Sequence, residues 1–78
     1  MTLKIISAEA IVFEGDVTAV TLPGALGSFT VLRNHASLVS TLTAGDIEYT
    51  DTTGHKETRR IEGGIADVDN NVVSVCLY

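Results

Sequence analysis

Residues 13–38 read FEGDVTAVTLPGALGSFTVLRNHASL, and the rest of the chain can be arranged around these residues. Two short apolar runs, residues 17–22 and 29–32, flank a loop over residues 23–27 that holds two glycines and the only proline. This pattern predicts a strand, an exposed loop and a second strand. Leu26 lies on that glycine-flanked loop, where an apolar side chain either folds back onto the domain or meets a partner.

The alternation of apolar and polar residues continues on both sides of this stretch, as expected for half-buried strands. No stretch has the spacing of an amphipathic helix of useful length. The sequence therefore predicts an all-β domain, an antiparallel sandwich or barrel. The glycines that separate its strands lie at positions 15, 24, 27, 45, 54, 63 and 64. Further strands are predicted around residues 3–5, 10–13, 38–42, 46–50, 56–61, 65–68 and 73–77.

Single residues predict local features of these strands. Residues 17–22 change their apolar phase midway, which predicts a β-bulge or burial on both faces. Gly15 beside Phe13 predicts another bulge or a sharp bend. Residues 56–61 are mostly polar and carry Lys and Arg, so we expect them at a sheet edge. Cys76 lies in an apolar strand pattern and is expected to be a small buried hydrophobic residue.

Two pairs of small residues predict sharp changes of chain direction. Asn70 and Asn71 predict a hairpin turn with left-handed backbone conformations. Gly63 and Gly64 lack the spacing of a phosphate-binding loop and no helix follows them, so they predict a bend or a close approach between strands.

The composition fits one small globular domain over residues 1–78, with 45% apolar and 19% charged residues. The net charge of −5 and a single basic pair, Arg59 and Arg60, argue against nucleic-acid binding. The one cysteine cannot form an internal disulfide. No secretory signal is recognised around Lys4, and proline and glycine interrupt the longest uncharged stretch, residues 17–32, so no transmembrane segment is expected.

His35 is the first candidate for chemistry, because hydroxyl and carboxyl groups surround it in sequence at Ser37, Ser40, Thr41 and Asp46. A serine–histidine–aspartate triad is recognised by geometry, and a chain rich in Ser and Thr supplies such neighbours by chance. We therefore predict no catalytic residue. The simplest interpretation is a structural histidine whose ring nitrogens bond loop backbone.

No metal site and no cofactor site is predicted. The two histidines, His35 and His55, lie far apart in sequence, and with one thiol they lack the ligand spacing of a zinc site. A calcium loop is only faintly suggested by Asp67, Asp69, Asn70 and Asn71, because the glycine and the glutamate that complete such a loop are missing.

Two blocks of the sequence carry a family pattern. The first reads Phe13-x-Gly15-x-Val17-x-x-Val20, Pro23-Gly24-x-x-Gly27, Val31-Leu32 and His35-Ala36-x-Leu38. The second reads Gly63-Gly64-Ile65-x-x-Val68-x-x-Asn71-Val72-Val73-x-Val75. In this order and at this separation they resemble the N-terminal β-sandwich domain of epsilon subunits of F-type ATP synthases. The resemblance covers nearly the whole chain and implies a flattened antiparallel β-sandwich of about ten short strands.

The resemblance also implies a function. Such a domain belongs to a non-catalytic central-stalk subunit of the rotor, which links the gamma subunit to the membrane c-ring, reaches the catalytic head indirectly and couples proton transport to ATP synthesis. Its implied location is the cytoplasmic face of the inner (plasma) membrane, where other subunits hold it. The implied c-ring contacts are Gly24, Ala25, Leu26, Gly27, Ser28 and Phe29. The implied gamma contacts are Arg33, His35, Ala36, Leu38, Val39 and Leu42.

The sequence departs from the family pattern in two respects. Ser28 stands where relatives often carry an acidic residue, so ring contact is expected to depend on Leu26 and on backbone groups. Relatives usually continue past the sandwich into a pair of helices, whereas this sequence ends at Tyr78. Inhibition by those helices, and the ATP site that they hold in some relatives, are therefore not carried over.

Two other classes of function are compatible with the sequence. A free-standing β-sandwich that binds a small ligand or a carbohydrate would need an aromatic platform or a pocket, for which the chain offers two Phe and two Tyr. A small hydrolase centred on His35 would lose its turnover in the His35→Ala variant. Recovery of gamma or c subunits in a pull-down would favour the stalk subunit over both.

Overall fold

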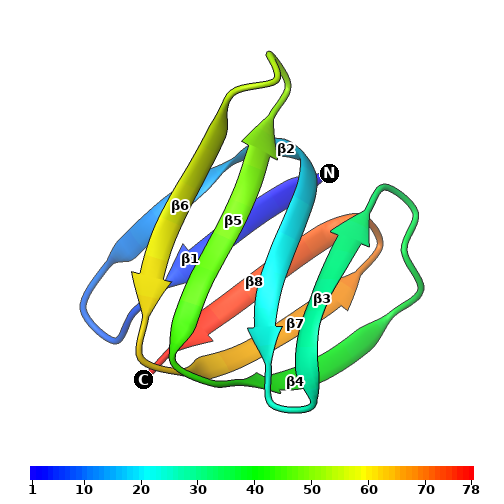
Figure 1. Ribbon diagram of the computed structural model, residues 1–78. Helices are drawn as coiled ribbons and strands as arrows, with labels where there is room; N and C mark the ends of the chain where they lie inside the picture. The colour runs from blue at the N-terminus through cyan, green and yellow to red at the C-terminus, as the bar shows by residue number, and fades with distance from the viewer.

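The computed structural model describes residues 1–78 and consists of strands joined by turns and loops. The strands are β1 (Thr2–Ile6), β2 (Ile11–Gly24), β3 (Gly27–Leu32), β4 (Leu38–Leu42), β5 (Gly45–Asp51), β6 (Lys56–Ile61), β7 (Gly64–Asp69) and β8 (Val72–Leu77). They form two packed layers (Figure 1). One layer holds β3, the C-terminal half of β2, β5 and β6, and the other holds β1, β8, β7 and β4. No helix of the structure has the length and hydrophobicity needed to cross a membrane.

The all-β sandwich expected from the sequence is confirmed, with eight strands in place of about ten. Part of the difference arises because residues 10–13 and 17–22, expected as separate strands, lie almost entirely within the single strand β2 of 14 residues. The strand pairs are antiparallel, apart from the parallel pair of β1 and β8.

β2 joins the two layers because its two halves pair with different strands. Near its start, Phe13 lies opposite Ile5 of β1. Further along, Val20 lies between Val31 of β3 and Tyr49 of β5. A single long strand therefore holds the layers in a fixed relation to each other.

The phase change predicted within residues 17–22 is a β-bulge. The register of β2 with β5 shifts between Val17 and Ala19, so Thr18 is an extra residue on the β2 side. As a result Val17 and Val20 both point into the core, where neither side chain is more than 2% exposed.

The bulge expected as one possibility at Gly15 is not present, and this expectation is corrected. Gly15 pairs regularly with Leu3, and the register shift between β1 and β2 lies elsewhere. The ring of Phe13 covers Gly15, since a Cβ built on the glycine would lie 3.0 Å from the ring. Phe13 also packs against Tyr49, with ring centroids 4.5 Å apart. The glycine thus leaves room for an aromatic side chain on the strand surface.

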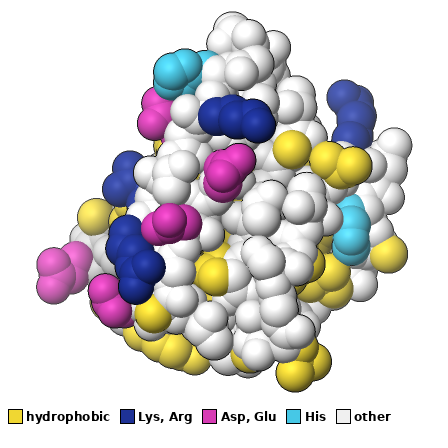
Figure 2. Space-filling model, viewed as in Figure 1, with side chains coloured by type: hydrophobic (Ala, Val, Ile, Leu, Met, Phe, Trp, Pro, Cys, Tyr) yellow, Lys and Arg dark blue, Asp and Glu magenta, His cyan; other side chains and the backbone are white.

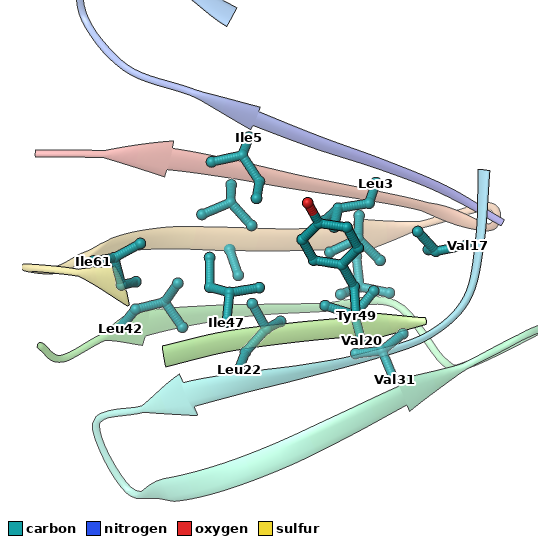
Figure 3. Close-up of a cluster of buried hydrophobic side chains, with 14 residues drawn as sticks. Leu3, Ile5, Val17, Val20, Leu22, Val31, Leu42, Ile47, Tyr49 and Ile61 are labelled. Atoms are coloured by element: carbon teal, nitrogen blue, oxygen red, sulfur yellow. The ribbon is translucent and has the colours of Figure 1, made fainter. Parts of the chain in front are cut away.

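The core lies between the two layers and contains 14 buried hydrophobic residues. Figure 3 shows Leu3 and Ile5 of one layer pointing toward Leu22, Ile47 and Tyr49 of the other. No polar or charged residue is buried, so the interior between the two layers is packed by apolar side chains.

Cys76 lies outside this core, contrary to the expectation from its sequence neighbours. Val73 and Val75 of β8 point inward, and the alternation of a strand therefore directs Cys76 to the outer face, where it is exposed. It pairs with Ile65 of β7, which also faces outward.

The two predicted changes of chain direction are confirmed. Asn70 and Asn71 have φ values of 48° and 61°, the left-handed conformations expected of their hairpin turn. Gly63 has a φ of 149°, and Gly64 lies so close to the backbone of Cys76 that a side chain would collide with it. The close approach predicted for the two glycines therefore lies between β7 and β8.

β6 forms one edge of its layer, as its polar sequence predicts, because it pairs with β5 alone. Figure 2 shows that Asp, Glu, Lys and Arg side chains gather on the side of the molecule that β5 and β6 occupy in Figure 1. Charged side chains at an edge oppose unwanted strand pairing.

Asp51 closes the hairpin between β5 and β6. Its Oδ1 accepts hydrogen bonds from the Thr53 hydroxyl at 2.7 Å, from the Thr53 backbone N–H at 2.9 Å and from the His55 backbone N–H at 3.0 Å. The bond from the Thr53 hydroxyl is the largest cause that holds the pKa of Asp51 below its ordinary value, and the backbone bond from His55 follows it. The ionised carboxylate is therefore part of the folded hairpin.

Because the pKa of Asp51 is lowered in the folded state, the free energy of unfolding depends on pH in the acidic range. The bonds to Asp51 stabilise the fold above the ordinary carboxyl pKa, and this contribution is lost as the pH falls below about 4. We expect the Asp51→Asn variant, which keeps the acceptor oxygen but cannot ionise, to lose stability less steeply below about pH 4 than the parent. Urea unfolding at a series of pH values measures this slope. Thr53→Val should reproduce part of the effect and Thr52→Val none, whereas superimposable profiles of Asp51→Asn and parent would contradict it.

Candidate functional site

β2 and β3 meet in a turn formed by Ala25 and Leu26, which lies between the paired residues Gly24 and Gly27. Gly27 has a φ of 126°, which favours glycine. Gly24 has no space for a side chain, since a Cβ there would lie 2.7 Å from the carbonyl oxygen of Gly27 and 2.9 Å from the ring of Phe29. The two glycines therefore permit a tight, projecting turn, which we call the β2–β3 tip (residues 24–29).

Backbone hydrogen bonds attach the β2–β3 tip to the second layer. The backbone N–H of Ala25 donates to the carbonyl oxygen of Thr41 at 2.9 Å, and that of Thr43 donates to the carbonyl oxygen of Pro23 at 2.8 Å. The direction in which the tip projects is thereby fixed. Leu26, at its end, is 105% exposed and packs on nothing within the domain.

A shallow hollow of about 480 Å³ lies between the β2–β3 tip and β4. Val39, which borders it, is 71% exposed. No side chain that lines the hollow is ionisable, so the hollow suits contact with apolar groups and offers no acid or base of its own. Figure 2 shows apolar side chains gathered at the lower edge of the molecule, where β2 and β3 meet in Figure 1. The lining residues are Gly24, Ala25, Leu26, Gly27, Ser28, Phe29, Val39, Ser40 and Thr41.

The loop of residues 33–37, between β3 and β4, is held by side chains of the β7–β8 turn. The Asn34 backbone N–H donates to Oδ1 of Asn71 at 2.6 Å, and Nδ2 of Asn71 donates to Oδ1 of Asn34 at 3.0 Å. The Ser37 hydroxyl donates to Oδ1 of Asp69 at 2.6 Å. These three bonds, which we call the asparagine clasp, fix an exposed loop that carries Arg33, His35 and Ala36.

His35 is placed as the simplest interpretation predicted. Its Nδ1 lies 2.8 Å from the carbonyl oxygen of Ala36, so the ring is bonded to loop backbone. The hydroxyl of Ser37 is directed to Asp69, and Ser40 bonds the carbonyl oxygen of Thr41. No hydrogen bond brings a serine and an aspartate to the histidine, and the triad considered from the sequence is not formed.

The structure keeps the expected c-ring set of residues together and separates the members of the gamma set. The whole c-ring set, Gly24 to Phe29, lies together at the β2–β3 tip. Val39 of the gamma set borders the hollow beside that tip. Leu42 is corrected: it is 2% exposed within the core, because strand alternation turns it inward, so its side chain cannot reach a partner. Leu38 is half-buried and packs against the core.

The asparagine clasp could not be predicted from the sequence. Asn34 and Asn71 are 37 residues apart, and each alone predicts only a turn. Their meeting depends on β4 pairing with β7, which brings the two turns to the same end of a sheet. The hollow has the same origin, because its two walls come from the β2–β3 tip and from β4.

The chain is similar in sequence to a known family and to individual proteins of that family. The family model described as the β-sandwich domain of the ATP synthase delta/epsilon chain matches residues 1–77. A protein of Wolinella succinogenes named ATP synthase epsilon chain is 43% identical over 75 residues, which are 96% of this chain and 57% of the relative. One of Nitratiruptor sp. with the same name is 44% identical over 71 residues, 91% of this chain and 55% of the relative. The chain thus spans somewhat more than half the length of these relatives.

Chains of solved ATP synthase structures are also similar to this chain. A chain in the mitochondrial ATP synthase of Euglena gracilis, in an assembly described as OSCP/F1/c-ring, superposes with a TM-score of 0.89 and 27% identity, over 96% of this chain and 48% of that one. A chain from the central stalk and c-ring of Tetrahymena thermophila mitochondrial ATP synthase has a TM-score of 0.81 and 11% identity, over 99% of this chain and 62% of that one, a likeness of fold alone.

Proposed function

The chain belongs to the ATP synthase delta/epsilon family, and on this premise we propose that residues 1–78 are the β-sandwich domain of a non-catalytic central-stalk subunit of an F-type ATP synthase. The observation that carries the proposal is the family match over residues 1–77. In this proposal the subunit is part of the rotor. It links the gamma subunit to the c-ring, so that proton transport is coupled to ATP synthesis. Its place is peripheral, at the cytoplasmic face of the inner (plasma) membrane.

We assign the c-ring contact to the β2–β3 tip together with the hollow beside it. Leu26 is the one large apolar side chain that stands wholly in solvent at this tip, and Val39 extends the apolar surface onto β4. Burying such side chains against loops of a partner is favourable, and the attachment of the tip to Thr41 keeps the ordering cost low. Ser28 places a hydroxyl, and no charge, at the rim.

We assign the gamma contact to the loop that the asparagine clasp holds, with Arg33, His35, Ala36 and Leu38. The clasp presents these residues in one conformation before binding, which reduces the entropy lost on association. β3 leads from the tip directly into this loop, so one strand connects the two proposed contacts.

Coupling requires a body that transmits torque without deforming. Of the 47 backbone hydrogen bonds, 38 lie within the strands, and the core is apolar throughout. Both features make the sandwich rigid, while its turns and loops remain free to bind. Two contacts on one rigid body also reinforce each other, since the first raises the effective concentration for the second.

The proposal predicts that Leu26→Asp separates ring contact from gamma contact. A carboxylate at the tip must be desolvated against the ring, so we expect that contact to weaken about tenfold or more. In an F-type ATP synthase reconstituted in lipid vesicles with this chain as its epsilon subunit, proton-driven ATP synthesis should fall strongly. Binding of isolated gamma should be unchanged.

Two further variants make this test selective. Ile11→Asp introduces the same charge at a residue that is 60% exposed and outside both proposed contacts, and it should leave synthesis and gamma binding intact. The double variant His35→Asp, Leu38→Asp should weaken gamma binding. Unchanged synthesis by the Leu26→Asp enzyme would refute the ring assignment, and failure of the parent chain to bind gamma would refute the stalk function itself.

A further inference from the structure

β3 is an edge strand with a free side. It pairs with β2, and no other strand is hydrogen-bonded to it. The pair Gly24 and Gly27 closes the two-residue turn, so alternation in an antiparallel ladder directs the backbone groups of Ser28, Thr30 and Leu32 away from β2. Ser28 pairs with Pro23, which has no N–H to donate to β3, and this is consistent with a pair that forms no hydrogen bonds.

Most of these outward backbone groups have no partner in the domain. Nine backbone hydrogen bonds lie outside the strands, and none of them involves Ser28 or Thr30. The carbonyl oxygen of Leu32 is used, because it accepts from the backbone N–H of His35 at 3.1 Å. The free side of β3 therefore presents the N–H and C=O groups of Ser28 and Thr30 and the N–H of Leu32, in the spacing that an added strand requires.

The two edges of this layer differ in their side chains. β6, at the other edge, reads KETRRI and is charged at Lys56, Glu57, Arg59 and Arg60. β3 reads GSFTVL and contains no charged residue and no proline. Charge and proline are the usual means by which a protein protects an edge, and β3 lacks both. The charged side chains of β6 thus oppose the addition of a further strand, whereas β3 has no such protection.

We propose that the free edge of β3 receives an extended segment of the gamma subunit, which adds to this layer as a further strand. The inference rests on the proposed function, and it names the mode of binding. We choose gamma as the partner because β3 leads directly into the loop of Arg33, His35 and Ala36, which is the proposed gamma contact. The segment is recognised by its backbone and is uncharged where it faces β3.

Thr30→Pro tests this mode of binding. The N–H of Thr30 points to the free side, so proline removes a donor from the edge and none from the domain's own ladder, a position where edge strands tolerate proline. We expect affinity for isolated gamma to fall about tenfold or more, since the added strand loses hydrogen bonds in register. Binding is measured by titration, and thermal unfolding checks that the variant is folded.

The other edge supplies a matched control. Thr30 pairs with Thr21, Thr21 with Glu48, and Glu48 with Thr58, so the four residues form one row across the layer. The alternation of hydrogen-bonded and non-hydrogen-bonded pairs therefore directs the N–H of Thr58 to the free side of β6. Thr58→Pro should therefore keep parental affinity within about twofold. Thr30→Val controls for the hydroxyl of Thr30, which lies 2.9 Å from that of Thr21, and should also bind as the parent does.

Amide hydrogen exchange of the parent gives a readout that needs no variant. Binding of gamma should slow exchange at Ser28 and Thr30 and leave Thr58 unchanged. Parental affinity of Thr30→Pro, or unchanged exchange at both amides, would overturn the added strand while leaving the stalk function intact. A dimer of the chain alone that Thr30→Pro dissociates would name a second copy as the occupant and overturn gamma. A parent that does not bind gamma at all would overturn this inference and the proposed function together.

Discussion

Replacing Gly64 with alanine is expected to destabilise the domain by about 3 kcal/mol or more, a large part of the stability of a chain this short. Gly64 opens β7 between two neighbours, paired with Leu42 of β4 and with Leu77 of β8. A Cβ there would collide with the carbonyl oxygen of Cys76 and would lie 3.3 Å from the Cα of Leu77. Both obstacles are backbone, so the strands must separate to relieve the contact.

Urea unfolding of Gly64→Ala against the parent measures this loss. Gly15→Ala is the matched control, since it makes the same substitution inside a strand. Its new Cβ would meet only the far end of the Phe13 ring, at 3.0 Å, and a side chain can give way. We expect the control to cost about 1 kcal/mol or less. If the two variants unfolded at the same urea concentration, the close approach of β7 and β8 would not limit residue size at Gly64.

The strands were predictable from sequence where a local signal was strong. The charged sequence of β6 predicted an edge, and Asn70 and Asn71 predicted their left-handed turn, because in each case the cause lies within a few neighbouring residues. Cys76 was misplaced because a shift of one residue in strand phase exchanges inside for outside. That phase is set by pairing with distant strands.

The candidate site shows the same division. The glycines that flank Leu26 predicted an exposed turn but left open whether its side chain folds back onto the domain or meets a partner, and in the structure it is fully exposed. The hollow beside it and the asparagine clasp could not be anticipated, since each joins residues from separate strand pairs. The open edge of β3 follows from topology alone. Nothing in the letters GSFTVL distinguishes an edge strand from a central one.

Truncating Ile47 to alanine is the second change expected to have a large effect, about 2–4 kcal/mol of lost stability. Ile47 is fully buried on β5, and Figure 3 places it between Leu22 and Leu42, where the two layers meet. Removing its outer carbons leaves a cavity that the rigid strands around it cannot close. For a domain of this size the loss corresponds to a fall in Tm of roughly 10–25 °C.

Ile65 provides the comparison, because it is the same residue type in a strand of the other layer but is 45% exposed on the outer face of β7. Ile65→Ala should lower Tm by only a few degrees, about 1 kcal/mol or less, since little packing is lost there. Thermal unfolding of both variants decides the matter. Equal losses would mean that the outer face of β7 is packed as tightly as the interior, which would contradict a sandwich whose rigidity comes from one core between two layers.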